Sequence, residues 1–195
     1  MPTGVALRDP RQQLFDAAER VLVRDGVTGL NSRAVTAEAG VAKGVLHRHF
    51  ADFDAFLTEL VLDRIARVEA QAASLRDAAG TGDVADTLTD ALITGFEPVV
   101  LALVVLVIAR DELRTRLRAA GTARLPLVGE SAAMVAGYLT AERDLGRLAP
   151  DADVDALAPT VIGAAHLLFT EQEGGPPEFA AVRKVVTTVL ATALR

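Results

Sequence analysis

The sequence predicts an all-α protein of about nine or ten helices, and three observations lead to this prediction. Apolar residues recur at helical spacing along most of the 195-residue chain. Capping residues, glycines and prolines separate these segments at intervals that suit helices joined by ordinary loops. No segment alternates apolar and polar residues as a half-buried strand does.

The first helix is expected to begin at Pro10, because proline is favoured at the first helical position. Asp9 would be its N-cap, and Gln12 stands three residues after this cap, as in a capping box. Gly26 follows Asp25 and is expected to end the helix in a left-handed conformation.

Two short helices are expected next, separated by a turn at Gly40-Val41. The second helix has Asn31 as its N-cap and ends at Gly40. In the third helix Leu46 and Phe50 lie four residues apart, so they share its buried face. Two short helices joined in this way are typical of a helix-turn-helix motif.

The rest of the chain is expected to form a larger helical body. Asp52 caps a long helix that runs to about Ala79, where a Gly-Thr-Gly-Asp stretch at residues 80–83 breaks it. The length of this helix suggests a connector between two bodies. Further helices are expected at residues 83–96, 99–118 in one piece or two, 127–145, 153–171 and 178–194. The predicted domains are therefore residues 1–51 and 52–195.

Composition excludes several classes of protein. Hydrophobic residues make up 51% of the chain, which indicates a packed domain and not a disordered tail. The absence of cysteine excludes disulfides, thiolate zinc sites, iron–sulfur clusters and cysteine nucleophiles. The most apolar stretch, residues 99–109, is far shorter than the ~20 residues of a membrane-spanning helix, and residues 1–14 lack the pattern of a secretory signal. We therefore expect a soluble, cytoplasmic protein with no membrane partner.

The distribution of charge separates the two predicted domains. The net charge of −6 argues against indiscriminate coating of nucleic acid, which depends on summed phosphate neutralisation. Residues 1–50, however, contain seven lysines or arginines against five acids. The acidic excess therefore lies in the second domain.

Residues 11–56 resemble the TetR family of transcriptional regulators. The family pattern is matched by Asp25-Gly26 after the first helix, the Asn31 cap, Ala39-Gly40-Val41 at the turn and the aromatic Phe50. The resemblance implies a homodimeric regulator, a repressor, that binds a palindromic operator in double-stranded DNA and releases it when a small-molecule effector binds. The helix-turn-helix domain would bind DNA, and residues 52–195 would bind the effector and dimerise. No cofactor, metal or enzymatic activity is expected.

The resemblance also implies which residues contact DNA: Arg33 on the second helix, and Lys43, Gly44, Val45, His47, Arg48 and His49 on the third. Helix geometry supports part of this set. A step of 100° per residue places Gly44 and Arg48 opposite the buried Leu46 and Phe50. Gly44 would let the backbone approach the duplex closely, and Arg48 can bind guanine or phosphate.

Three positions depart from the family pattern. Ala42 stands where Ser or Thr usually caps the third helix, which removes a bond worth ~1 kcal/mol. His47 replaces the usual Tyr, and Phe53 replaces the usual Lys at the start of the fourth helix. Two phosphate contacts are therefore altered or lost. His47 and His49 could be read as metal ligands, but their i, i+2 spacing puts them on different helix faces.

The last two helices are expected to form the dimer interface, as the resemblance implies for this region. The apolar stripes that would form it are Leu157, Val161, Ala164, Leu168, Val182, Val186 and Val189. Ordinary core packing of a monomer explains these stripes equally well. A dimer is favoured because a single helix-turn-helix reads too few base pairs, whereas two copies reach successive major grooves.

A mainly apolar effector is expected inside the second domain. His166 lies about 200° around its helix from Ala164, so it points away from the expected dimer interface. The candidate ligand-binding residues are Glu97, Leu103, Tyr138, Ile162, His166 and Phe169. A core histidine bonded to a carbonyl or carboxylate is the alternative for His166. Residues 99–109, apolar on every side, should be enclosed by neighbours or line a cavity.

Other readings stay open. The arginines that follow the apolar helix form a solvated face, or else bind an anionic ligand or the DNA backbone: Arg110, Arg114, Arg116, Arg118 and Arg124. A helical enzyme would have to use Asp90, Glu97, Asp111 or His166, without an activated nucleophile, phosphate loop or metal cluster to support it. An adaptor that has lost DNA binding is suggested by Val45, His47 and Phe53.

Overall fold

The computed structural model describes residues 9–171, 175 and 177–195. Within them lie ten helices and no strand, which confirms the all-α class. The helices are α1 (Pro10–Gly29), α2 (Ser32–Glu38), α3 (Gly44–His49), α4 (Phe53–Asp77), α5 (Val84–Gly95), α6 (Pro98–Ala109), α7 (Asp111–Ala119), α8 (Val128–Asp144), α9 (Val154–Thr170) and α10 (Phe179–Val189).

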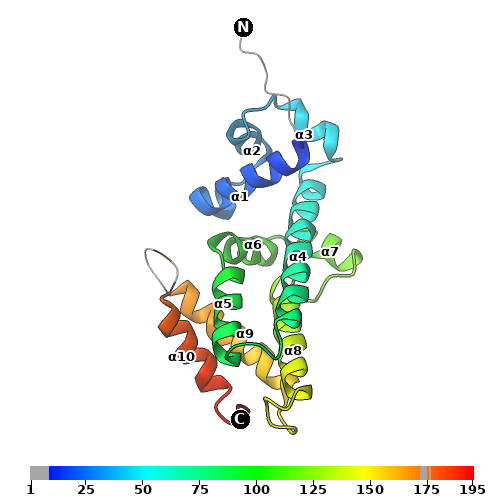
Figure 1. Cartoon of the computed structure of the whole chain (residues 1–195). Coiled ribbons are helices and arrows are strands. Elements are labelled where there is room, and N and C mark those ends of the chain that lie inside the picture. The colour runs from blue at the N-terminus through cyan, green and yellow to red at the C-terminus, as the bar shows by residue number, and fades with distance from the viewer. Residues whose placement is uncertain (1–8, 172–174, 176) are drawn as a thin grey trace.

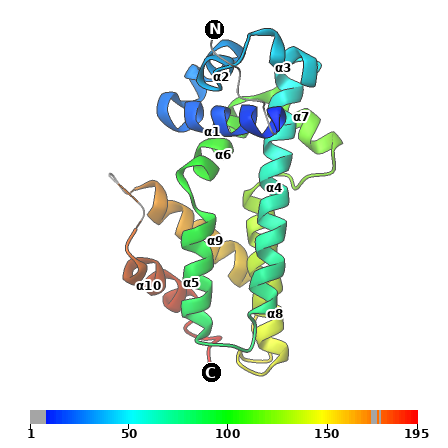
Figure 2. The same cartoon turned by 45° about the horizontal axis from the view of Figure 1, so that its top comes forward.

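The helices form a small N-terminal unit above an elongated helical body (Figure 1). Helices α1 to α3 lie at one end, and α4 runs from them along the whole body. Within the body α8 packs against α4 and α9, while α10 packs against α5 and α9 (Figure 2). Helix α6 lies directly beneath α1 and contacts it, so it is a second link between the two units.

The N-terminus of α1 forms half of the expected capping box. The Asp9 side chain accepts hydrogen bonds from the backbone N–H groups of Arg11 and Gln12, at 3.0 and 3.1 Å. The Gln12 side chain donates to Asp16 instead of returning to the cap, so the second bond of the box is not formed. Gly26 adopts a φ of +69° and interrupts α1 where the sequence predicted its end, although one further turn follows it.

Two expected helices differ from the structure. Residues 99–118 form two helices, because the backbone at Arg110 is extended between α6 and α7. The last helix ends at Val189 and not at residue 194, because the chain turns back to pair with the segment that follows α8. Leu194 forms an isolated antiparallel bridge with Leu148, and the Ala149 N–H donates to the Ala193 carbonyl at 2.8 Å.

Helix α6 is less enclosed than its composition predicted. Six of its apolar side chains are buried, but Val105 and Ile108 are each 55% exposed. The expectation that residues 99–109 are enclosed by neighbours or line a cavity is therefore wrong for Val105 and Ile108. Among the described residues no single helix is long and apolar enough to cross a membrane. Helices α5 and α6 have the required length and composition only when taken together, and a bend of 63° separates them.

Candidate nucleic-acid interface and ligand cavity

Helix α3 presents an exposed, cationic face. Lys43, Gly44, His47 and Arg48 are exposed, while Leu46 is completely buried. Val45 and His49, which also belong to the expected DNA-contacting set, are half-buried. The arrangement agrees with the face calculated from the sequence.

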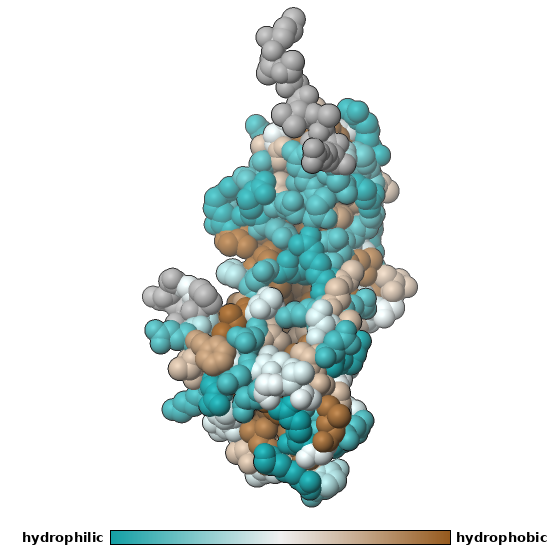
Figure 3. Space-filling model, in the orientation of Figure 1, coloured by the Kyte–Doolittle hydropathy of each residue, from teal (hydrophilic) through white to brown (hydrophobic). Residues whose placement is uncertain are grey.

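The expected contact on α2 is also free to reach a partner. Arg33 is exposed, and among the described residues neither it nor Lys43 nor Arg48 forms an ion pair. The face of this domain seen in Figure 3 is mostly hydrophilic. Three exposed positive charges on α2 and α3 are therefore without an ion-pair partner among the described residues of an acidic protein.

An aromatic cluster fixes α3 on the domain. The Phe50 ring meets the Phe56 ring edge-on with centroids 5.0 Å apart, and the Phe15 ring lies 5.8 Å away. The Arg11 guanidinium lies 4.5 Å from the Phe50 ring centre, a cation–π contact, and donates to the His49 carbonyl at 3.2 Å. The C-terminal end of α3 is thus held by packing and by a hydrogen bond.

Helix α2 is held to α1 by charged side chains. Arg20 and Arg24 donate to the two oxygens of Glu38 at 2.8 and 2.7 Å, and these bonds lower the pKa of Glu38. The Gln13 amide donates to the Ala39 carbonyl at 2.8 Å, which caps the end of α2. Helices α1 and α2 therefore have a fixed mutual orientation.

Two glycines of the motif are expected to respond differently to alanine. Gly40 has a φ of +66° with open space around its α-carbon, so Gly40→Ala should lower the free energy of unfolding by roughly 1–2 kcal/mol through backbone strain alone. Gly44 also has open space but lies in α3 without a positive φ, so Gly44→Ala should preserve or raise stability. Urea unfolding of both variants tests this. Equal losses would show that the turn does not require its left-handed conformation.

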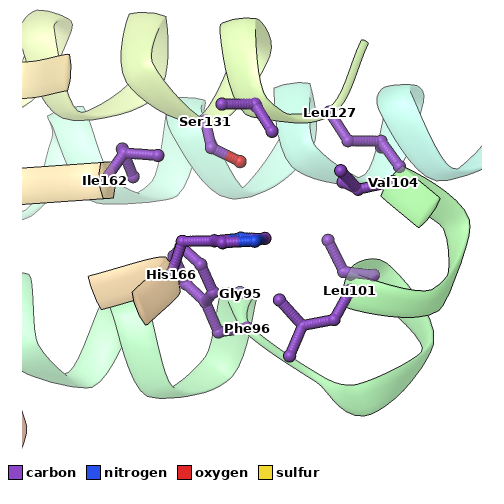
Figure 4. A pocket seen from close by; sticks show the side chains of 10 residues that line it. Gly95, Phe96, Leu101, Val104, Leu127, Ser131, Ile162 and His166 are labelled. Atoms are coloured by element: carbon purple, nitrogen blue, oxygen red, sulfur yellow. The ribbon is translucent and has the colours of Figure 1, made fainter. Parts of the chain in front are cut away.

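The helical body contains a small apolar cavity between α5, α6, α8 and α9 (Figure 4). Its lining residues are Gly95, Phe96, Val100, Leu101, Val104, Leu127, Val128, Ser131, Ile162 and His166. The Ser131 hydroxyl and the His166 ring point into the cavity from opposite sides (Figure 4). Its volume is about 10 Å³, which is room for roughly one water molecule.

Two of the six expected ligand residues, Ile162 and His166, line this cavity. Within the described residues the His166 ring has no hydrogen-bond partner, so it is not the bonded core histidine of the alternative reading. Phe169 lies behind the lining and stacks on Phe96 at 5.0 Å.

The other three expected residues lie elsewhere, which corrects that part of the site. Leu103 and Tyr138 are completely buried in the core. Burial raises the pKa of the Tyr138 phenol, whose hydroxyl donates to the Val84 carbonyl at 3.4 Å. Glu97 pairs with Arg64 outside the cavity.

Arg64 contacts acids of both the N-terminal unit and the helical body near the N-terminus of α6. Arg64 on α4, only 8% exposed, pairs with Glu97 at the start of α6 and lies 3.8 Å from Glu19 on α1. One oxygen of Glu19 is buried and has no hydrogen-bond partner among the described residues. Burial raises the pKa of Glu19, and the Arg64 charge opposes this rise.

The C-terminal end of α6 is tied to the first turn of α4. Arg110 donates to Asp54 at 2.9 Å and its guanidinium lies 5.7 Å from the Phe53 ring centre. Arg116 donates to both oxygens of Asp52, at 3.0 and 3.1 Å. The Ala55 N–H and then Arg116 lower the pKa of Asp52.

The arginine run is thus not simply a solvated face. Arg110, Arg114 and Arg116 each pair with an acid, Arg114 with Asp111. Phe53, which replaces a family lysine, stacks on Phe56 at 5.6 Å and therefore has a packing role. Among the described residues no group of three His, Asp or Glu side chains is arranged to hold a metal ion.

Three of the seven expected dimer residues lie inside the subunit. Val161, Val182 and Val186 are completely buried, which corrects their assignment to an interface. The others are half-buried: Leu157, Ala164, Leu168 and Val189. The apolar stripes face the core of their own subunit because that core is the nearest apolar environment. The exposed stripe of α9 consists instead of Ala156, Thr160, Gly163 and Leu167.

Comparison with known proteins extends these observations. Residues 14–60 match the family model described as bacterial regulatory proteins of the tetR family. A search of curated proteins found no match. Among solved structures, the chain is similar to a transcriptional regulator from Rhodococcus sp. Rha1, with 18% identity, TM-score 0.70 and coverage of 94% of this chain and 97% of the other.

Two further solved structures have the same fold over almost the whole chain. The reduced form of NemR from E. coli has 15% identity and a TM-score of 0.72, with coverage of 95% of this chain and 97% of that one. The multidrug binding protein EbrR, complexed with imidazole, has 25% identity and a TM-score of 0.55, with coverage of 94% and 96%. The likeness therefore includes the helical body as well as the helix-turn-helix domain.

Proposed function

We propose that this chain, which belongs to the TetR family of transcriptional regulators, is a repressor that binds a palindromic operator as a homodimer and is released by a small, mainly apolar effector. The observation that carries the proposal is the exposed cationic face of α3, held rigidly on an otherwise acidic protein. Helix α3 would enter the major groove, where side chains read base edges. Action on chromosomal DNA would place the protein in the cytoplasm.

The exposed cations have distinct proposed roles. Arg48 lies on the outer face of α3, where it would bind guanine or a phosphate. Lys43 at the start of α3 and Arg33 on α2 would bind phosphates on either side. Gly44 would allow close approach of the backbone, whereas the half-buried Val45 and His49 would contribute at most partial contacts.

A second copy of the chain is the proposed partner in the dimer. The exposed stripe of α9 has small side chains at Ala156 and Gly163, which would let two helices approach closely, and an apolar side chain at Leu167 that is 60% exposed. Phe179 at the start of α10 is 40% exposed. An interface formed by α9 and α10 of both copies is supported by this apolar surface and by the need to reach two half-sites.

The cavity between α5, α6, α8 and α9 is the proposed effector site. Its lining is apolar apart from Ser131 and His166, a composition usual for small-molecule sites. Among the described residues no carboxylate lines it, which disfavours cationic effectors. The likeness to EbrR, described as a multidrug binding protein, supports a ligand site in a body of this shape.

Helix α6 is the proposed link between effector and operator. Val100 and Val104 line the cavity. At the start of α6, Glu97 pairs with Arg64 of α4, which also lies 3.8 Å from Glu19 of α1, and after its end Arg110 pairs with Asp54 in the first turn of α4. An effector that prefers a displaced α6 would also favour a displaced DNA-binding domain. The effector would shift the equilibrium between the operator-binding state and the displaced state, and with it the spacing of the two recognition helices. The size of this shift is limited by the difference between its affinities for the two states.

Replacement of Arg48 by alanine tests the operator proposal. If Arg48 binds phosphate, its replacement removes one phosphate contact per subunit. The slope of the logarithm of the binding constant against the logarithm of the salt concentration should then decrease in magnitude by about two. If it reads guanine, discrimination at that base pair should fall by about 1–3 kcal/mol. Fluorescence anisotropy with DNA from the gene's own upstream region measures both.

Lys184→Ala is the matched control, because Lys184 is an exposed cation on α10 at the end of the body far from α3. It should leave affinity and salt dependence unchanged. Absence of specific binding by the wild-type protein would favour the adaptor function instead.

A further inference from the structure

The cavity is small in this structure. Its volume of about 10 Å³ compares with roughly 300–1,000 Å³ for typical small-molecule sites. An effector of ordinary size therefore does not fit unless one of the lining elements moves. The question is which lining residue is arranged to move.

Leu127 is distinguished from the other lining residues by its backbone. Its φ of +69° is the only positive value of a non-glycine residue in the part of the chain that the structure describes. With ψ of −45° the residue lies near the strained γ-turn region, which L-residues rarely adopt. Its side chain is completely buried and lines the end of the cavity beside Val104 (Figure 4).

The strained conformation is held by the first turn of α8. The two carboxylate oxygens of Glu130 accept hydrogen bonds from the Leu127 N–H at 2.6 Å and the Ala123 N–H at 3.0 Å. At Gly129 a Cβ atom would lie only 2.5 Å from the Cβ of Ala123, so the segment before Leu127 is packed directly on α8. Strain of this kind persists only where surrounding contacts enforce it, and it is concentrated at ligand sites and switches.

We propose that Leu127 is the gate of the cavity and limits the size of the ligand that it admits. The proposal rests on the cavity being the effector site. Movement of Leu127 out of the cavity relieves its positive φ and opens space for a molecule about as large as one aromatic ring. Ser131 and His166 are the polar side chains among the described lining residues. The ligand therefore carries one hydrogen-bonding group at its centre and is otherwise apolar.

Leu127→Ala and Leu127→Gly test the gate, with benzene as the probe and calorimetry as the measurement. Apolar cavities of about 150 Å³ bind benzene. Both variants should therefore bind it at least about tenfold more tightly than the wild type. Leu125→Ala is the matched control, because Leu125 is 38% exposed in the same loop and does not line the cavity. Equal benzene affinity in the wild type and both Leu127 variants would overturn the proposal.

The two variants also test the strain separately. Glycine adopts positive φ freely, so Leu127→Gly should unfold at a higher temperature than Leu127→Ala, the reverse of the usual order. Glu130→Gln, which weakens the hold on the loop, should speed hydrogen exchange of the Leu127 amide. A lower unfolding temperature for the glycine variant, or unchanged exchange in Glu130→Gln, would overturn the gate as a strained element.

Phenol tests the ligand class. In Leu127→Ala it should bind more tightly than benzene, and His166→Leu in the same background should remove that preference. No preference for phenol would overturn the assignment of a ligand with a hydrogen-bonding group.

All of these measurements are made without DNA. A gate that admits benzene in a protein without operator affinity would refute the proposed repressor alone, whereas an operator-binding protein whose Leu127 variants reject benzene would refute the gate alone.

Discussion

Replacement of Arg64 by methionine should lower the free energy of unfolding by about 3 kcal/mol, within the range observed when one partner of a buried ion pair is removed. Methionine retains much of the apolar stem but removes the charge. Glu19, whose side chain is 15% exposed, would then keep a buried carboxylate without its nearest cation. Glu97 is half-exposed, so water would compensate for its loss of the same partner.

Glu19→Gln in the Arg64→Met background should restore most of the lost stability, because it removes the buried charge.

The stability lost in Arg64→Met should also depend on pH. Burial raises the pKa of folded Glu19 above the ordinary 4.5, so protonation favours the folded state. Stability from this group is therefore fully present below pH 4.5 and is lost as pH rises through the raised pKa. Without Arg64 the pKa rises further, so the deficit of the variant should shrink as pH falls toward 4.5.

Arg67→Met is the control for Arg64. Arg67 lies one turn further along α4 but is 43% exposed, and within the described residues its ion pair is with Asp63. Its loss should change stability by about 0.5 kcal/mol or less. Urea unfolding of the three variants between pH 5 and pH 8 measures these effects. Equal losses for Arg64 and Arg67 would mean that the pair between the domains does not stabilise the fold.

Local sequence signals predicted the N-terminal domain well because its helices begin and end at residues that act within a few positions. The Asn31 and Asp52 side chains cap α2 and α4, and Gly26 and Gly40 adopt the positive φ expected of terminators. The buried face of α3 follows from Leu46 and Phe50, four residues apart, and both are buried. These features need no knowledge of the distant chain.

The sequence was less informative where two distant segments meet. An apolar stripe predicts that a helix face is buried, but not whether the same subunit or a partner subunit buries it. Val161 and Val186 were therefore assigned to a partner, although their own subunit encloses them. Leu127 lines the cavity only because the loop after α7 packs back on α8, and no local pattern announces this. The Arg64 cluster likewise joins residues 33 and 45 positions apart.

Replacement of Leu167 by glutamate should convert the proposed dimer into a folded monomer and weaken operator binding by about 100-fold or more, because the second half-site would no longer be bound by the same molecule. Leu167 is 60% exposed in the single subunit, so a charge there leaves the core intact. In a dimer formed through α9, two glutamates would be brought together in an apolar interface, where unpaired charges are strongly unfavourable.

Leu145→Glu provides the matched control for Leu167→Glu, since Leu145 is 58% exposed at the end of α8, outside the proposed interface. It should remain dimeric and bind the operator normally. Val161→Glu should instead unfold the subunit, because that side chain is completely buried. Light scattering at micromolar concentration and circular dichroism distinguish the three outcomes. A Leu167→Glu protein that stays dimeric would place the interface on another surface. A wild-type protein that is monomeric would remove the dimer from the mechanism, because only the DNA itself would then join the two half-sites.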